Sequence, residues 1–108
     1  MSVLMTLRAK GDAAALESHA AADPAGMKAI MDQAVANGLI AHRFYASPEG
    51  DIMVVDEWPD PESFQRFFAA TEAQIGPMMQ AAGVASEPEV KFWRKLEMGD
   101  DYGWGAED

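Results

Sequence analysis

The order of apolar and polar residues along the chain predicts four strands and two helical segments. Apolar residues recur at every second position in four short segments, which we expect to be strands at residues 3–9, 39–46, 52–58 and 89–98. Between the first two strands, apolar residues fall at helical spacing from Met27 to Val35. Asp12 can cap a first helical piece, and Asp23 with Pro24 forms a second start signal. The expected structure is one long helix, kinked or broken near Pro24.

The second helical segment follows the third strand. Asp60 can cap it, Pro61 suits its first turn, and Gly83 closes it. Gly76 and Pro77 are expected to interrupt it, because proline has no N–H to donate within a helix.

These elements, in the order β-α-β-β-α-β, predict a ferredoxin-like α+β fold in which two helices cover one face of a four-stranded antiparallel sheet. Strands two to four carry apolar residues at both alternations, so we expect neither face of the sheet to meet water. The simplest cover for the second face is the sheet of another copy, which predicts a homodimer, a dimeric α+β barrel. The domain spans residues 1–98, and an acidic tail follows at 99–108, where Tyr102 and Trp104 can anchor on a neighbouring surface.

The turn between strands two and three predicts how they pair. Pro48 suits the first central position of a type I turn, and Gly50 supplies the left-handed residue of a three-residue hairpin loop. That loop places His42 directly opposite Asp56, and strict alternation puts Trp58 on the same face.

Composition narrows the classes of partner. A net charge of −10 disfavours nucleic acid and membrane surfaces, and no run of residues is apolar and long enough to span a bilayer. The chain has no cysteine, which suits a cytoplasmic protein, and its two histidines have no metal-binding spacing. It also lacks a glycine-rich phosphate loop, so we expect neither a metal nor a cofactor. The apolar surplus, 49% of residues, predicts a ligand cavity or a self-association surface instead.

The stretch "FYASPEGDIMVVDEWPDPESFQRFF" resembles the hairpin and the start of the second helix in the antibiotic-biosynthesis monooxygenase-like family of dimeric α+β barrels. The resemblance in element order extends over about residues 2–98. It implies cofactor-free oxygenation of aromatic polyketides or haem degradation, and related barrels cyclise polyketides. By this resemblance, Trp58 matches a tryptophan that borders the ligand pocket. Haem degradation is disfavoured, because "AATEAQ" on the second helix lacks the haem-ligating histidine and the region of Met5 and Thr6 lacks the family's asparagine.

His42 and Asp56 are the candidate catalytic residues. Opposed residues on paired strands come close enough for an imidazole and a carboxylate to hydrogen-bond, and Asp56 would stabilise the imidazolium and fix one tautomer, as a general base requires. The alternative is a structural polar pair. The candidate substrate-binding residues, each of which has core packing or an exposed position as its alternative, are Trp58, Phe44, His19, Met27, Met31, Phe67 and Phe68.

Three functions are consistent with these residues. The first is a homodimer that binds a small apolar or aromatic molecule and oxidises it without a cofactor, with His42 removing a proton from a phenol or enol. The second is non-oxidative acid-base catalysis, such as cyclisation or isomerisation, by the same pair. The third is a non-catalytic binding or assembly module in which His42 and Asp56 are structural.

Overall fold

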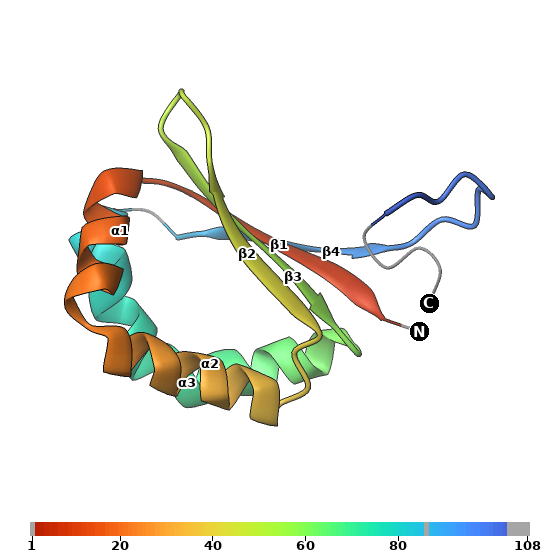
Figure 1. Ribbon diagram of the computed structural model, residues 1–108, viewed down its shortest axis with the longest axis horizontal. Helices are drawn as coiled ribbons and strands as arrows, with labels where there is room; N and C mark the ends of the chain where they lie inside the picture. The colour runs from red at the N-terminus through yellow and green to blue at the C-terminus, as the bar shows by residue number, and fades with distance from the viewer. Residues whose placement is uncertain (1, 86, 104–108) are drawn as a thin grey trace.

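The computed structural model describes residues 2–85 and 87–103. The elements along the chain are β1 (Val3–Lys10), α1 (Ala13–Ala22), α2 (Pro24–Ala36), β2 (Ala41–Ala46), β3 (Asp51–Trp58), α3 (Pro61–Ala81) and β4 (Glu89–Arg94). The strands form one antiparallel sheet in the order β2-β3-β1-β4, and the helices lie together on one side of it (Figure 1). This confirms the predicted ferredoxin-like α+β fold.

The first helical segment consists of two helices, so three helices rather than two cover the sheet. Asp23 causes the break: its backbone ends α1, and its carboxylate accepts a hydrogen bond from the Gly26 N–H at 3.0 Å, capping the start of α2. Pro24 follows at the first helical position, where its missing N–H costs nothing. The predicted break near Pro24 is therefore confirmed.

The predicted interruption of the second segment at Gly76 and Pro77 is wrong, because α3 continues through both residues. Pro77 has no N–H to donate to the carbonyl of Ala73. Because Ala73 and Pro77 are both exposed, water can satisfy that carbonyl. On the opposite side of the helix, Ile75 and Met78 are buried in the core and hold the last turns in place. The helix ends at Ala81, and Gly83 follows the C-cap residue Ala82 with a φ of 73°, as predicted.

The start of α3 is capped by Asp60. Its carboxylate accepts hydrogen bonds from the backbone N–H and the hydroxyl of Ser63, both at 2.8 Å. These bonds favour the ionised form and hold the pKa of Asp60 below its ordinary value of 3.8.

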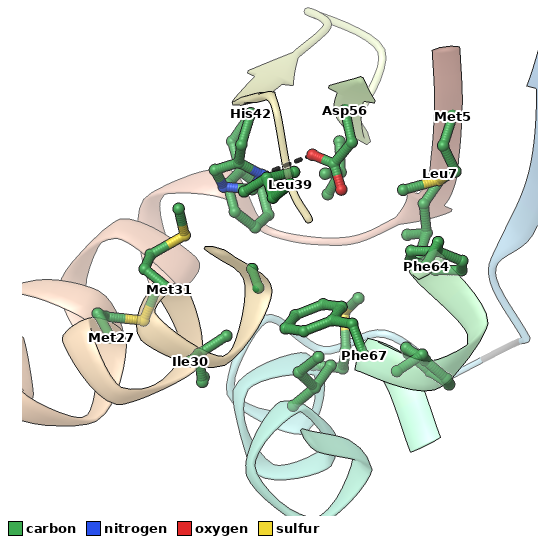
Figure 2. A pocket seen from close by; sticks show the side chains of 16 residues that line it. Met5, Leu7, Met27, Ile30, Met31, Leu39, His42, Asp56, Phe64 and Phe67 are labelled. Atoms are coloured by element: carbon green, nitrogen blue, oxygen red, sulfur yellow. Dashed lines mark hydrogen bonds and ion pairs between the residues drawn. The ribbon is translucent and has the colours of Figure 1, made fainter. Parts of the chain in front are cut away.

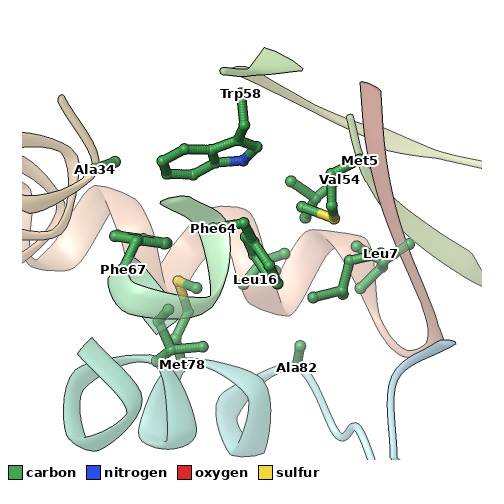
Figure 3. Close-up of a cluster of buried hydrophobic side chains, with 12 residues drawn as sticks. Met5, Leu7, Leu16, Ala34, Val54, Trp58, Phe64, Phe67, Met78 and Ala82 are labelled. Atoms are coloured by element: carbon green, nitrogen blue, oxygen red, sulfur yellow. The ribbon is translucent and has the colours of Figure 1, made fainter. Parts of the chain in front are cut away.

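The hydrophobic core lies between the sheet and the helices. β1 and β3 contribute alternate residues to it, and α3 contributes the residues of its inner face (Figure 3). The buried residues of this core are Met5, Leu7, Leu16, Ala34, Ile52, Val54, Trp58, Phe64, Phe67, Ile75, Met78 and Ala82.

The opposite side of the sheet, which we call the open face, has no helix against it within residues 2–85 and 87–103. Three of its large side chains are 41 to 48% exposed, namely Leu4, Tyr45 and Trp93. It also has a hollow, in which the space open to a water molecule is about 850 Å³. The hollow is lined by Leu4, Ala41, His42, Arg43, Tyr45, Met53, Val55, Asp56 and Glu57.

The last strand is shorter than predicted, because β4 ends at Arg94 and not at residue 98. β4 is an edge strand that pairs with β1, and Arg94 is already opposite Val3, where β1 begins. Beyond it, Lys95 forms an ion pair with Asp101, which raises the pKa of Lys95. Tyr102 is 94% exposed, and Trp104, the other predicted anchor of the tail, lies outside the described residues.

Candidate functional site

The hairpin of β2 and β3 has the register that its turn predicts. Gly50 has φ of 90°, the left-handed conformation that favours glycine, and the Ser47 N–H donates to the carbonyl of Asp51 at 2.9 Å. The ladder then pairs Phe44 with Val54 and His42 with Asp56. The even register sends the side chains of His42, Asp56 and Trp58 to the helix-covered face.

These three side chains form one hydrogen-bonded chain. His42 Nδ1 is 2.7 Å from Asp56 Oδ1, and the Trp58 indole N–H donates to Asp56 Oδ2 at 3.1 Å. Asp56 is buried at 4% exposure, whereas the His42 side chain keeps 24%. The two polar groups that contact the carboxylate therefore offset the cost of burying it.

The other nitrogen of His42 is unengaged. Nε2 lies on the side of the ring away from Asp56 (Figure 2), and among the residues that the structure describes it has no hydrogen-bond partner. The ring is steadied by Phe44, whose ring meets it edge-on at a centroid distance of 5.1 Å. A histidine held at one nitrogen and open at the other has the arrangement that proton transfer requires.

A pocket lies beside this histidine, between the sheet and the helices (Figure 2). We call it the helix-side pocket. Its lining consists of Met5, Leu7, Met27, Ile30, Met31, Ala34, Leu39, His42, Phe44, Val54, Asp56, Phe64, Phe67, Phe68, Ile75 and Met79. Every lining residue except His42 and Asp56 is apolar, and the space open to a water molecule is about 60 Å³. The pocket is thus a narrow apolar slot with one ionisable pair.

Most of the predicted substrate-binding residues line this pocket. Phe44, Met27, Met31, Phe67 and Phe68 do so from three separate elements, β2, α2 and α3. The lining also includes residues that were not candidates from the sequence, namely Met5, Leu7, Ile30 and Leu39. Period-two and period-3.6 patterns place such residues on the inner face but do not separate pocket from core.

Trp58 lies behind the lining of the pocket. It is fully buried at 0% exposure and lies outside the pocket lining, packed against Phe64 and Phe67 (Figure 3). Its link to the site is therefore the hydrogen bond to Asp56.

His19 is also outside the pocket lining. It lies in the last turn of α1, half-buried, and is not among the residues around His42.

The described residues contain no group of three or more His, Cys, Asp or Glu side chains placed to hold a metal ion. Within the same residues, none of the helices combines the length and the hydropathy needed to cross a lipid bilayer.

Comparison with known proteins identifies the fold. No protein-family model matches the sequence, and no curated protein matches it. Solved structures do. SnoaB, a cofactor-independent oxygenase from Streptomyces nogalater, is 16% identical, with a TM-score of 0.60 over 93% of this chain and 98% of that one.

Two further structures are similar to the same extent. The monooxygenase from the gene ActVA-Orf6 of Streptomyces coelicolor, in complex with nanaomycin D, is 16% identical, with a TM-score of 0.60 over 88% of this chain and 86% of that one. A dimeric ferredoxin-like protein from an uncultured marine organism is 16% identical, with a TM-score of 0.63 over 88% of both chains. The chain therefore has the ferredoxin-like α+β fold of the antibiotic biosynthesis monooxygenase-like proteins.

Proposed function

We propose that the protein binds a small aromatic molecule with an ionisable hydroxyl in the helix-side pocket, and that His42 removes the hydroxyl proton. The observation that carries this proposal is the composition of the pocket. Its lining is apolar apart from His42 and Asp56, so a ligand that buries an aromatic ring there has one polar pair to contact. The open Nε2 of His42 is the acceptor for its hydroxyl.

Proton removal makes oxidation by dioxygen feasible without a cofactor. A phenolate is electron-rich at the ring carbon opposite its oxygen, and reaction of that carbon with O₂ gives a hydroperoxide. Loss of water then leaves a quinone. One oxygen atom becomes the new carbonyl and the other leaves in water with the two hydrogens that the substrate loses, so no external reductant is required. A pocket without other polar groups keeps bulk water away from the phenolate.

The pocket must widen to admit such a ligand, because about 60 Å³ is less than an aromatic bicycle occupies. Three half-buried methionines, Met27, Met31 and Met79, line it. Methionine side chains are unbranched and change rotamer readily, so they can move aside at low cost. These residues support adaptable binding of flat apolar rings.

We further propose that the functional unit is a homodimer joined through the open face. Leu4 lies opposite Trp93 on the paired strands β1 and β4, and Tyr45 adds a third large exposed side chain on β2. Apolar residues of this size on the uncovered face of a sheet favour burial against another sheet. Light scattering should report about twice the 11.7 kDa chain mass.

Oxygen uptake with 1-naphthol tests the proposed reaction. We expect wild-type protein to consume one O₂ per naphthol and to form the quinone, and His42→Ala to lose at least about a hundredfold in kcat, the scale of general base catalysis. His19→Ala is the matched control, since His19 does not line the pocket.

The other outcomes separate the alternatives. Binding of 1-naphthol without oxygen uptake, together with His42-dependent proton transfer, would favour the non-oxidative acid-base enzyme. Binding that is the same in wild type and His42→Ala, with no turnover by either, would contradict the base role and favour a binding module.

A further inference from the structure

The carboxylate of Asp56 is shared between two side chains, and Trp58 is the more rigid of them. Trp58 has no exposed surface, and its indole packs against Phe64 at a centroid distance of 5.9 Å and against Phe67 at 5.4 Å. Figure 3 shows the indole above these two rings. The indole N–H is therefore a donor with a fixed direction, aimed at Asp56 Oδ2.

A fixed donor restricts what the other carboxylate oxygen can do. An indole N–H can only donate, and a carboxylate can only accept. With Oδ2 bonded to Trp58, Oδ1 remains in line with His42 Nδ1 at 2.7 Å. The neutral imidazole must then keep its proton on Nδ1, and its lone pair is on Nε2, the nitrogen turned away from Asp56 (Figure 2).

We propose that Trp58 is a positioning residue: its indole N–H orients the side chain at position 56, which selects the His42 tautomer whose Nε2 can accept a proton from the ligand. This inference rests on the proposed function for its consequence in catalysis, but its structural part is independent of any turnover. Trp58 itself does not contact the ligand, since it lies outside the pocket lining.

Asp56→Asn tests the orientation directly. If Trp58 orients position 56, its N–H captures the amide oxygen, and the amide NH₂ faces His42 Nδ1. Nδ1 must then accept, so the imidazole proton moves to Nε2. An amide that Trp58 does not orient would instead turn its oxygen to His42 and leave the proton on Nδ1.

The readout is nitrogen NMR of protein labelled at histidine, at a pH where its own titration shows the imidazole neutral. The chain has two histidines, and His19→Gln assigns their signals. We expect the Nδ1–H tautomer in wild type, the Nε2–H tautomer in Asp56→Asn, and a mixture in Asp56→Asn combined with Trp58→Phe. Retention of the Nδ1–H tautomer in Asp56→Asn would overturn the proposal.

The His42 tautomer in Trp58→Phe alone is a second test, with Trp93→Phe as its matched control. The Trp93 indole N–H also donates a hydrogen bond, to Thr6 Oγ1 at 2.9 Å, but on the open face. Without the indole N–H the Asp56 carboxylate can turn out of line with His42 Nδ1, so we expect Trp58→Phe to populate the second His42 tautomer in part. Trp93→Phe should leave only the Nδ1–H tautomer populated. Equal spectra for the two variants would contradict a specific role of Trp58, and an unfolded Trp58→Phe leaves the Asp56→Asn test in force.

Turnover of 1-naphthol then separates this proposal from the proposed function. Where wild type is active, we expect Trp58→Phe to lower kcat roughly tenfold with little change in KM, as for a residue that acts only through the base. Loss of the tautomer selection with unchanged kcat would refute its catalytic consequence. A selected tautomer in a protein without turnover would refute the proposed function and leave the positioning role intact.

Discussion

Replacing Asp56 with alanine removes both hydrogen bonds of the buried carboxylate at once. The Trp58 indole N–H, buried at 0% exposure, loses its acceptor at 3.1 Å and cannot reach bulk water. A buried donor left without a partner costs about 1–3 kcal/mol, and a lost hydrogen bond to a charged group costs about 1.5–3 kcal/mol. Removal of a buried charge returns part of this, because its desolvation no longer opposes folding. We therefore expect a net loss of about 2–4 kcal/mol in the free energy of unfolding.

Urea denaturation measures this loss, at one fixed protein concentration so that self-association contributes equally to each variant. Melting temperature should fall by about 10 °C or more, at ~4–8 °C per kcal/mol for a domain near this size. Asp32→Ala is the control: Asp32 is exposed and forms a surface pair with Lys28 at 2.8 Å, so we expect a change below about 1 kcal/mol. If Asp56→Ala unfolds within about 0.5 kcal/mol of wild type, the hydrogen-bonded chain has no structural role and our reasoning about its geometry fails.

Three further perturbations test the fold around the site. Asp60→Ala should lower the melting temperature above about pH 4, and the effect should shrink progressively below that pH. The reason is that a carboxylate with a lowered pKa stabilises the folded state above its unfolded pKa and loses that effect as the pH falls through its folded pKa. A difference in melting temperature that does not depend on pH would contradict the capping bonds. Gly50→Ala should cost about 1–2 kcal/mol by urea denaturation from its φ of 90° alone, since no heavy atom lies within 4 Å of the added Cβ; an unchanged stability would argue against this turn. Trp93→Glu should shift light scattering from the dimer to the monomer mass, and a dimer that persists would place the interface elsewhere than the open face.

The sequence predicted the hairpin because local chemistry decides it. A proline and a glycine two residues apart allow few loop conformations, and loop length fixes the pairing of every residue beyond it. The contact between His42 and Asp56 follows from that pairing alone. Likewise, an aspartate followed by a proline both ends one helix and starts the next, which explains the break at Asp23.

Features that depend on tertiary contacts were predicted less well. Pro77 suggested an interruption from its own chemistry, but burial of Ile75 and Met78 outweighs it. β4 stops where its partner strand begins, which no property of residues 95–98 reveals. Trp58 could be assigned to the correct face, but whether a tryptophan lines a pocket or lies behind it depends on how α3 packs over it.

A crystal structure with 1-naphthol bound tests the central claim most directly. We predict the ring between the methionines of α2 and the phenylalanines of α3, with the hydroxyl oxygen about 2.6–3.2 Å from His42 Nε2. Naphthol bound on the open face, or in the helix-side pocket with its hydroxyl away from His42, would contradict the account.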